Sequence, residues 1–386
     1  MVDDEVASVL SVHWRAGEVS GHDKLYLGGV SPVQVDDVLQ EMLMAWGGVS
    51  SPQALARDSL LVLHVECKPS TQAAALLIGR WYPAQLFKDV PEGVRLVQLK
   101  GVEGMAVTVD CNHPLADADV RFEVVSAASL PSSPGRLELP LRRKMQHWLF
   151  GGVGLQAYPL RDLFDSDAAR TRQDVANDAV FYSQPRLVQH IDAWARGTIS
   201  QWYAAAFAEH AEVLDLMSSW VTHLPLARDD LHVDGLGMNE YELSSNTRLR
   251  NYFVHDLNST PDLPVVGATY DGVVCSVSVE YLTDPVAVFA SVAAVLGACG
   301  SFANAFSNRC FPTKAIALWG QLQPFERMAF VADLYAKTGA YGPCFMQSMS
   351  GAPRPPEDDY VAQLPDADPV YLVTANTNAP CPQSLA

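Results

Sequence analysis

The residues of this chain that are able to do chemistry are spread along it rather than gathered in one motif. Seven cysteines, an odd number, occur in 386 residues with no CxxC pair and no histidine at metal-ligand spacing. We therefore expect reduced thiols and no metal site. Cys275 follows an apolar run, and we expect it to be a small buried core residue rather than a nucleophile.

A second set of candidate side chains lies between residues 181 and 192. Arg186 offers a fixed fork of N–H donors that suits a carboxylate, and Tyr182, Gln184 and His190 could line the opening of a site. His190 has only Asp192 as a nearby carboxylate, on a different face of a predicted helix. For each residue the alternative is a plain surface or packing position.

The elements that would position these groups alternate regularly in the C-terminal half. Strands are predicted at residues 213–217, 232–238, 252–257, 270–278 and 301–307. Helices are predicted at residues 240–245, 285–296, 313–318 and 324–338. This α/β alternation predicts a parallel, doubly wound sheet, with ligands at the carboxyl ends of its strands.

Residues 342–349 and 369–375 can complete the sheet as an antiparallel pair. The segments EVLDL (212–216) and VHDLN (254–258) and the block 263–302 resemble class I S-adenosylmethionine-dependent methyltransferases of the type 11 group. The resemblance implies a Rossmann-like, seven-stranded methyltransferase sheet with S-adenosylmethionine as cofactor.

In that family the first strand ends in an acidic residue and a glycine-rich loop, whose small residues let the backbone approach the cofactor. The resemblance makes Asp215 the acidic residue, with Ser218 and Ser219 as the nearest small residues of a loop that lacks the glycines. The second strand ends at Gly237, where the family has a ribose-binding carboxylate, and Asn239 is the nearest polar substitute.

The remaining cofactor residues implied by the resemblance follow the next two strands. Asp256 fits the residue that meets the adenine amino group, or else caps a turn. Leu257 and Ser276 complete the set. The implied acceptor-binding residues are Tyr182, Arg186, His190, Asn308 and Arg309. The alternative for the last two is a strand-to-helix loop capped by Thr313. No catalytic residue is assigned, because an activated methyl donor needs alignment more than acid–base groups.

Residues 1–150 are predicted to form a smaller, mainly β domain of α+β type. Strands are expected at residues 59–65, 94–99, 105–109 and 120–125, and a helix at 35–46. The segment 107–125, centred on the sequence NHPLA at 112–116, resembles the strand-turn-strand that closes the SlyD-like branch of the FKBP prolyl isomerases. The aromatic set of those enzymes cannot be traced, so an inactive FKBP-like scaffold is expected.

The segment between the domains, residues 151–210, is predicted to be a linker with cap helices. One amphipathic helix or a pair of helices is expected at 184–203, with Pro185 in the first turn. A loop is expected at residues 131–135. The methyltransferase-like domain is expected to span residues 211–386.

The composition argues against nucleic acids and membranes as partners. The formal net charge is −18, from 44 acidic and 26 basic residues, and the longest basic run, 142–144, is too short to track a phosphate backbone. No apolar run is long enough for a membrane span. The acidic start of the chain predicts a cytoplasmic protein, with a removed organelle presequence as the alternative.

Together these features predict an enzyme that transfers a methyl group to a small-molecule acceptor, with the N-terminal domain as cover, partner surface or homodimer module. The alternative is a non-catalytic methyltransferase-like binding or assembly protein fused to an inactive FKBP-like module.

Overall fold

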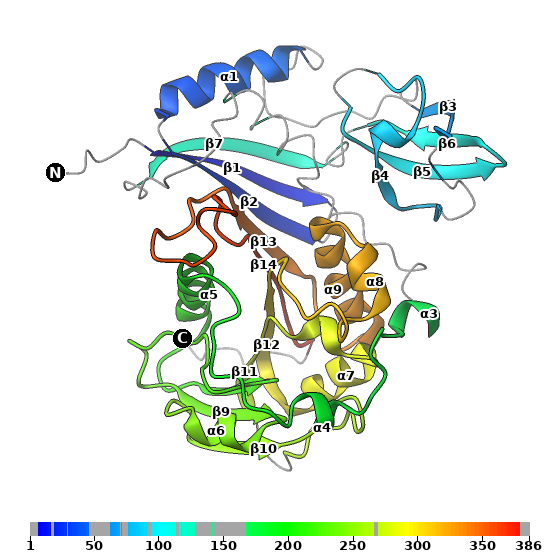
Figure 1. Cartoon of the computed structure of the whole chain (residues 1–386). Coiled ribbons are helices and arrows are strands. Elements are labelled where there is room, and N and C mark those ends of the chain that lie inside the picture. The colour runs from blue at the N-terminus through cyan, green and yellow to red at the C-terminus, as the bar shows by residue number, and fades with distance from the viewer. Residues whose placement is uncertain are drawn as a thin grey trace. The chain divides into compact units, whose positions relative to one another are not determined.

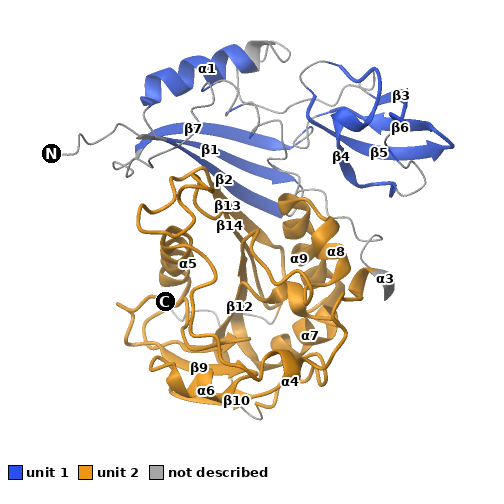
Figure 2. Ribbon diagram, viewed as in Figure 1, with its two compact units in different colours: residues 1–132, 136–163 blue, residues 133–135, 164–386 orange. Residues whose placement is uncertain are grey.

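The computed structural model describes residues 7–16, 19–28, 30–45, 62–69, 71, 76–91, 94–112, 116, 118–127, 141, 145, 148, 167–265 and 269–378. The chain forms two compact units (Figure 2). The first comprises Met1–Ser132 and Arg136–Leu163, and the second comprises Ser133–Gly135 and Phe164–Ala386.

The second unit is built on one mixed sheet (Figure 1). Its described strands are β8 (Glu212–Leu216), β9 (His232–Gly237), β10 (Asn251–Val254), β11 (Tyr270–Ser276), β12 (Leu296–Phe306), β13 (Phe345–Ser350) and β14 (Val370–Asn376). Within this unit their order is β10-β9-β8-β11-β12-β14-β13. The strands β8 to β12 are parallel, and β14 lies antiparallel between β12 and β13. The predicted parallel sheet and antiparallel pair are both confirmed.

Helices cover both faces of this sheet (Figure 1). On one face α5 (Ala193–Ala206) packs Ile199 and Tyr203 into a core with strand residues such as Val213. On the other, α7 (Pro285–Val295) and α9 (Pro324–Thr338) place Phe289 and Tyr335 against Phe302 of β12. Strands covered on both faces explain the near-continuous apolar runs of the sequence.

Most predicted helices of this unit occur where the periodicity places them, including α6 (Glu240–Ser245), α7 and α9. The predicted helix at 313–318 is wrong, because α8 (Ala317–Gln321) begins four residues later. The Thr313 carbonyl accepts a hydrogen bond from the Asp174 amide at 2.8 Å, and Arg172 pairs with Ile316 in a β-bridge. Those tertiary contacts hold residues 313–316 out of a helix, so Thr313 is not its cap.

The predicted helix at 184–203 is also wrong in its first half. The preceding helices are short, α3 (Asp167–Arg170) and α4 (Asp178–Phe181), and Pro185 lies outside any helix. The helix α5 starts only after Asp192, whose side chain accepts a hydrogen bond from the Ala195 amide at 2.8 Å. The Asp192 carboxylate also accepts one from the Asp368 amide at 2.6 Å. This buried N-cap sets the start of the helix.

The first unit contains two antiparallel sheets. One has the order β2-β1-β7, from β1 (Ala7–Ala16), β2 (Val19–Gly28) and β7 (Asp119–Ala127). The four-stranded sheet β3-β6-β5-β4 consists of β3 (Val62–Glu66), β4 (Trp81–Pro83), β5 (Leu96–Glu103) and β6 (Ala106–Asp110). The helix α1 (Pro32–Ala45) packs on β1 and β7.

Sequence patterns missed β1, β2 and β4. In β2 the alternation is broken by Asp23, which is buried because its carboxylate accepts a hydrogen bond from the Trp14 indole at 2.9 Å. The strands β6 and β7 on either side of the NHPLA turn belong to different sheets. Residues 113–115 of that turn, the loop 131–135 and the basic run 142–144 lie outside the described residues.

The expectation of reduced thiols is wrong for Cys299, which takes part in a disulfide. Spacing along the chain carries no information on such pairing, which depends on the fold. The free cysteines among the described residues are Cys67, Cys111, Cys275, Cys310 and Cys344, and Cys275 is buried as expected. In the described part of the chain, no helix is both long and apolar enough to span a bilayer.

Candidate functional site

A cavity of about 150 Å³ lies at the carboxyl ends of β8, β9, β10 and β11. Residues 217–221, 237–239, 255–258 and 276–278, which follow those four strands, form most of its wall. The chain runs from β8 toward β10 on one side and from β11 toward β12 on the other, so the cavity lies where the strand order reverses. Open α/β sheets bind their ligands at this point.

The cavity brings most of the predicted site residues together. Those lining it are Asp215, Ser218, Ser219, Gly237, Asn239, Asp256, Leu257, Ser276, Tyr182, Arg186 and His190. Asn308 and Arg309 do not line it. The Arg309 Nε lies 3.7 Å from the Asp368 carboxylate, and the Asn308 amide oxygen accepts a hydrogen bond from the Ser307 hydroxyl. Phe311 is the residue of that loop that reaches the cavity.

Two backbone positions of the cavity wall are strained. Met217, just beyond β8, has φ 58°, and Val277, just beyond β11, has φ 47°. The left-handed region costs a residue with a side chain roughly 1–3 kcal/mol and is rare for a β-branched residue. Backbone strain of this kind concentrates at binding sites, where the surrounding structure holds it. The glycine-free loop therefore adopts a turn that glycine would adopt more easily.

Asp215 is buried at the floor of the cavity. Burial raises the pKa of its carboxyl to about 6, against hydrogen bonds from the hydroxyls of Ser218 and Thr222 that lower it. The Ser218 hydroxyl donates to Asp215 at 2.7 Å, and the Ser218 amide donates to the Leu236 carbonyl at 2.7 Å. Asp215 thus organises the loop after β8 as well as lining the cavity.

Replacing Asp215 with asparagine is expected to change the pH dependence of stability. Between its ordinary pKa of 3.8 and about 6, the folded state keeps a proton that the unfolded state has lost, so wild-type stability falls as pH rises across that range. The asparagine variant has no carboxyl group at this position, so its stability does not fall in this way. The stability difference should move in favour of the variant by about 2 kcal/mol between pH 4 and pH 7. Urea titrations of both proteins at each pH measure it, and parallel pH profiles would contradict it.

The end of β9 has no room for a side chain. A Cβ atom on Gly237 would lie 2.2 Å from the Ser218 carbonyl oxygen. The nearby Asn239 is the N-cap of α6, since its side-chain oxygen accepts from the Glu242 amide at 3.0 Å. Its Nδ2 donates to the Tyr182 carbonyl at 2.8 Å and to the Ser183 carbonyl at 3.3 Å. Asn239 therefore fastens residues 182–183 to α6.

Asp256 lies in the turn that follows β10. One carboxylate oxygen accepts from the Asn258 amide at 2.9 Å, and the other accepts from the Ser259 hydroxyl at 2.6 Å. These contacts are those of a turn cap. Asp256 also lines the cavity, and its contact with an adenine amino group stays a prediction.

The cavity wall at the end of β11 is polar, and its Ser276 hydroxyl is within hydrogen-bond distance of another side chain of the protein. The Ser276 hydroxyl lies 3.0 Å from the hydroxyl of Tyr203, a fully buried residue of α5. Two histidines, His190 and His223, also line the cavity. Burial lowers the pKa of both, that of His223 to about 4, so both rings are neutral at pH 7.

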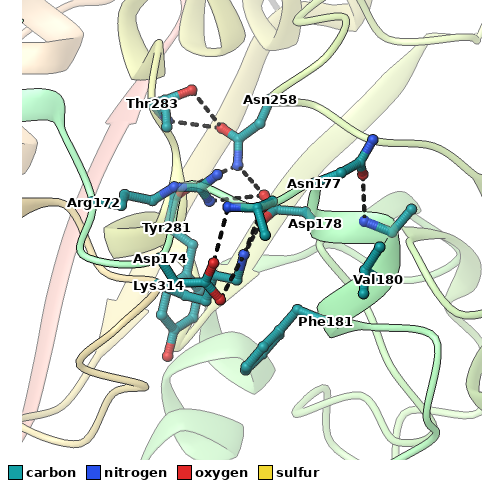
Figure 3. Close-up of polar contacts among 12 residues, drawn as sticks. Arg172, Asp174, Asn177, Asp178, Val180, Phe181, Asn258, Tyr281, Thr283 and Lys314 are labelled. Atoms are coloured by element: carbon teal, nitrogen blue, oxygen red, sulfur yellow. Dashed lines mark hydrogen bonds and ion pairs between the residues drawn. The ribbon is translucent and has the colours of Figure 1, made fainter.

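A buried ionic network holds the segment 172–181 beside the cavity (Figure 3). The Asp178 carboxylate accepts hydrogen bonds from Arg172 Nη1 and Asn258 Nδ2, both at 2.8 Å, and lies 3.0 Å from Lys314 Nζ. Lys314 is fully buried and also pairs with Asp174 at 3.2 Å. Asn258 in turn accepts from the Thr283 amide at 2.8 Å. The network ties the turn after β10 to the loops after β11 and β12.

Arg186 lies among aromatic rings. Its guanidinium carbon is 4.4 Å from the centre of the Phe181 ring and 5.7 Å from that of Phe311, and Nη2 donates to the Phe181 carbonyl at 2.9 Å. Such stacking is favourable for a planar cation. Its Nη1 donates a longer hydrogen bond to the Gln184 carbonyl at 3.4 Å, and these contacts orient Arg186 at the cavity wall.

Sequence patterns missed several residues of the cavity. These are Asp178, Trp220, His223, Glu242, Asn258 and Phe311. Trp220 and His223 lie shortly after β8. They could have been predicted if more of the residues that follow this strand had been considered as candidates. Glu242 lies in the first turn of α6, three residues after an N-cap, and its direction depends on how that helix packs. Among the described residues, no group of three or more His, Cys, Asp or Glu side chains could hold a metal ion.

Models of known protein families give no match to the sequence, and no curated protein matches it. The structure is similar to that of an S-adenosylmethionine-dependent methyltransferase from Mesorhizobium loti, with 17% identity, 47% of this chain and 99% of that chain covered, and a TM-score of 0.29. It is also similar to a TehB-like S-adenosylmethionine-dependent methyltransferase from Corynebacterium glutamicum, with 14% identity, 48% and 89% covered, and a TM-score of 0.31.

Proposed function

We propose that the second unit binds S-adenosylmethionine in its cavity and transfers the methyl group to a small-molecule acceptor. The observation that carries this proposal is the sheet itself, a parallel set ordered β10-β9-β8-β11-β12 and closed by the antiparallel β14, with a cavity at the reversal point. This arrangement, with its antiparallel pair at one end, is typical of class I methyltransferases.

The groups around the cavity fit such a cofactor. The carboxyl groups of Asp215, Glu242 and Asp256 line it together with the hydroxyls of Ser218 and Ser276, and a sulfonium cation with ribose and amino groups needs acceptors of this kind. The cofactor supplies an activated methyl group. The residues of the chain then bind and align, which is what that reaction chiefly needs.

Residues near the opening are proposed to hold the acceptor. Tyr182, Arg186 and His190 line the same cavity from the segment before α5. With both cavity histidines neutral at pH 7, this wall presents aromatic rings, a neutral imidazole and the cation of Arg186. The acceptor is therefore proposed to be a small molecule held by stacking and by the guanidinium.

Calorimetric titration of the full chain with S-adenosylmethionine and with S-adenosylhomocysteine tests the proposed function. We expect binding of both ligands with one site per chain and a rise in melting temperature. S-adenosylhomocysteine is the cleaner probe because it carries no reactive methyl group. No heat and no thermal shift with either ligand at millimolar concentration would contradict the proposal.

A second candidate is a non-catalytic methyltransferase-like binding or assembly protein. The observation that favours it is Met217, a strained non-glycine residue at the point where the family pattern needs a glycine. The first unit, proposed to be an FKBP-like scaffold without isomerase activity, would then supply a partner or homodimer surface. Binding of S-adenosylhomocysteine without turnover of any acceptor would favour this second function.

A further inference from the structure

Two histidines of the cavity have ring nitrogens that other described residues do not use. His190 and His223 both line the cavity, and within the described part of the chain neither imidazole has a hydrogen bond to another residue. The ring of His190 packs edge-on against Phe311, with the ring centres 5.1 Å apart and the planes at 79°. An aromatic contact therefore sets the orientation of this imidazole, and both of its nitrogens remain available to a ligand.

The other groups of the cavity wall that are basic near neutral pH already have partners. Each of the following side chains lies within hydrogen-bond distance of another group of the second unit: Asp178, Asp215, Glu242, Asp256 and His255. Asp178 also neutralises Lys314. Among the residues that the structure describes, His190 and His223 are therefore the cavity bases that remain for a ligand.

The surroundings of the two rings separate their roles. Burial lowers the pKa of His190, the Glu242 carboxylate acts to raise it, and the Arg186 guanidinium acts to lower it. For His223, burial, Arg196 and His190 all act to lower the pKa, to about 4. An imidazole that takes up a proton becomes a cation, so the carboxylate near His190 favours that step, whereas the neighbours of His223 oppose it. His190 also retains solvent exposure, so a proton can pass from its ring to water.

A base in the cavity points to one class of methyl acceptor. A neutral amine has a free lone pair and a carboxyl group is already ionised at pH 7, whereas a phenolic hydroxyl has a pKa of about 10 and keeps its proton. The phenolic oxygen has to lose this proton as its bond to carbon forms. The cavity wall also presents the rings of Tyr182, Trp220, Tyr281 and Phe311, which favour an aromatic ligand.

Resting on the proposed function, we propose that the acceptor is a small phenol and that His190 is the catalytic base that takes its hydroxyl proton. The phenolic oxygen forms a bond to the methyl carbon while the bond from that carbon to sulfur breaks, and the electron pair of the broken bond stays on sulfur. The hydroxyl proton moves to a ring nitrogen of His190 and then to solvent water. Charge balances, because the sulfonium becomes a neutral thioether and one proton is released.

The acceptor class is tested with the full chain, S-adenosylmethionine and three probes of similar shape: 4-methylphenol, 4-nitrophenol and 4-methylaniline. Methylated products are measured by mass spectrometry at pH 8.5, where 4-nitrophenol is ionised and 4-methylphenol is not. We expect wild type to methylate the two phenols on oxygen in preference to the aniline on nitrogen.

The variant His190→Ala separates a catalytic base from a residue that only packs. Loss of a general base costs roughly a hundredfold to ten-thousandfold in rate, so methylation of 4-methylphenol should fall by that factor. Methylation of 4-nitrophenol, which has no proton left to remove, should fall by less than about threefold. His64→Ala, at an exposed histidine of the first unit, is the matched control and should keep both wild-type rates. Melting temperatures confirm that each variant is folded.

Equal losses for the two phenols in His190→Ala, or a selective loss in His223→Ala instead, overturns the assignment of His190. A preference of wild type for 4-methylaniline, or turnover of none of the three probes, overturns a phenol as the acceptor. Calorimetric binding of S-adenosylhomocysteine distinguishes these outcomes from failure of the proposed function, because cofactor binding in the cavity stands wherever that ligand binds. Failure of wild type to bind it overturns the proposed function, and the role of His190 falls with it.

Discussion

Asp178→Ala is expected to lower the free energy of unfolding of the second unit by about 3 to 5 kcal/mol. The substitution leaves Lys314 without one of its two carboxylate partners in a fully buried position, and it removes the partner of Arg172 Nη1. Breaking a buried ion pair by removing one partner is among the most destabilising changes a single substitution makes. Urea titration followed by tryptophan fluorescence measures the loss.

The loss should depend on pH in a defined direction. Burial acts to raise the pKa of Asp178, but hydrogen bonds from Arg172, Asn258 and Lys314 outweigh it and hold the pKa below its ordinary 3.8. The stabilisation is therefore fully present above that value and is lost as pH falls through the lowered pKa. Asp262→Ala, at an exposed aspartate of the same unit, is the control and should change little. A loss for Asp178→Ala no larger than that of the control would contradict the prediction.

Gly237→Ala is expected to lower the free energy of unfolding by about 3 kcal/mol, at the upper end for overpacking. The added methyl group would lie 2.2 Å from the Ser218 carbonyl oxygen and 3.2 Å from a methyl of Leu243. The first of these is a backbone atom held by the hydrogen bond of the Ser218 amide to Leu236. Relief therefore requires the loop after β8 to move, and we expect ligand binding in the cavity to fall with stability.

Gly197→Ala is the matched control for this change. Gly197 lies within α5, and a Cβ there would have no atom within 4 Å. Alanine is the better helix former by about 1 kcal/mol, so this variant should be more stable than wild type. The melting temperature of Gly237→Ala should be lower than that of wild type, and that of Gly197→Ala should be higher. A melting temperature of Gly237→Ala equal to that of wild type would contradict the prediction, because the loop after β8 would then accommodate the methyl group without loss of stability.

The sequence was sufficient for the main architecture of the second unit because two local signals coincide there. Buried parallel strands are short apolar runs, and amphipathic helices between them have their own period. The candidate site could be predicted from the same signals, since the polar residues beyond strand ends must meet at one edge of the sheet. Asp215 and Asp256 were assigned by the resemblance to a known family, and both line the cavity.

Features that depend on contacts between distant residues could not be predicted. The start of α5 is set by Asp192 and Asp368, which are 176 positions apart. The non-helical stretch at residues 313–316 is set by contacts with the segment 171–174. Neither partner is visible in a local window. In the first unit β2 was missed because a buried aspartate looks like an exposed one until its partner Trp14 is known.

The position of β14 has a consequence for the order in which the second unit can be assembled. This strand is the last of the described chain, yet it lies between β12 and β13 and joins them. During synthesis β13 leaves the ribosome with its place beside β14 still unmade, while β8 to β12 can already pair with one another. Completion of the sheet therefore waits for residues 370–376, and until then β12 presents an unpaired edge of the kind that chaperones protect.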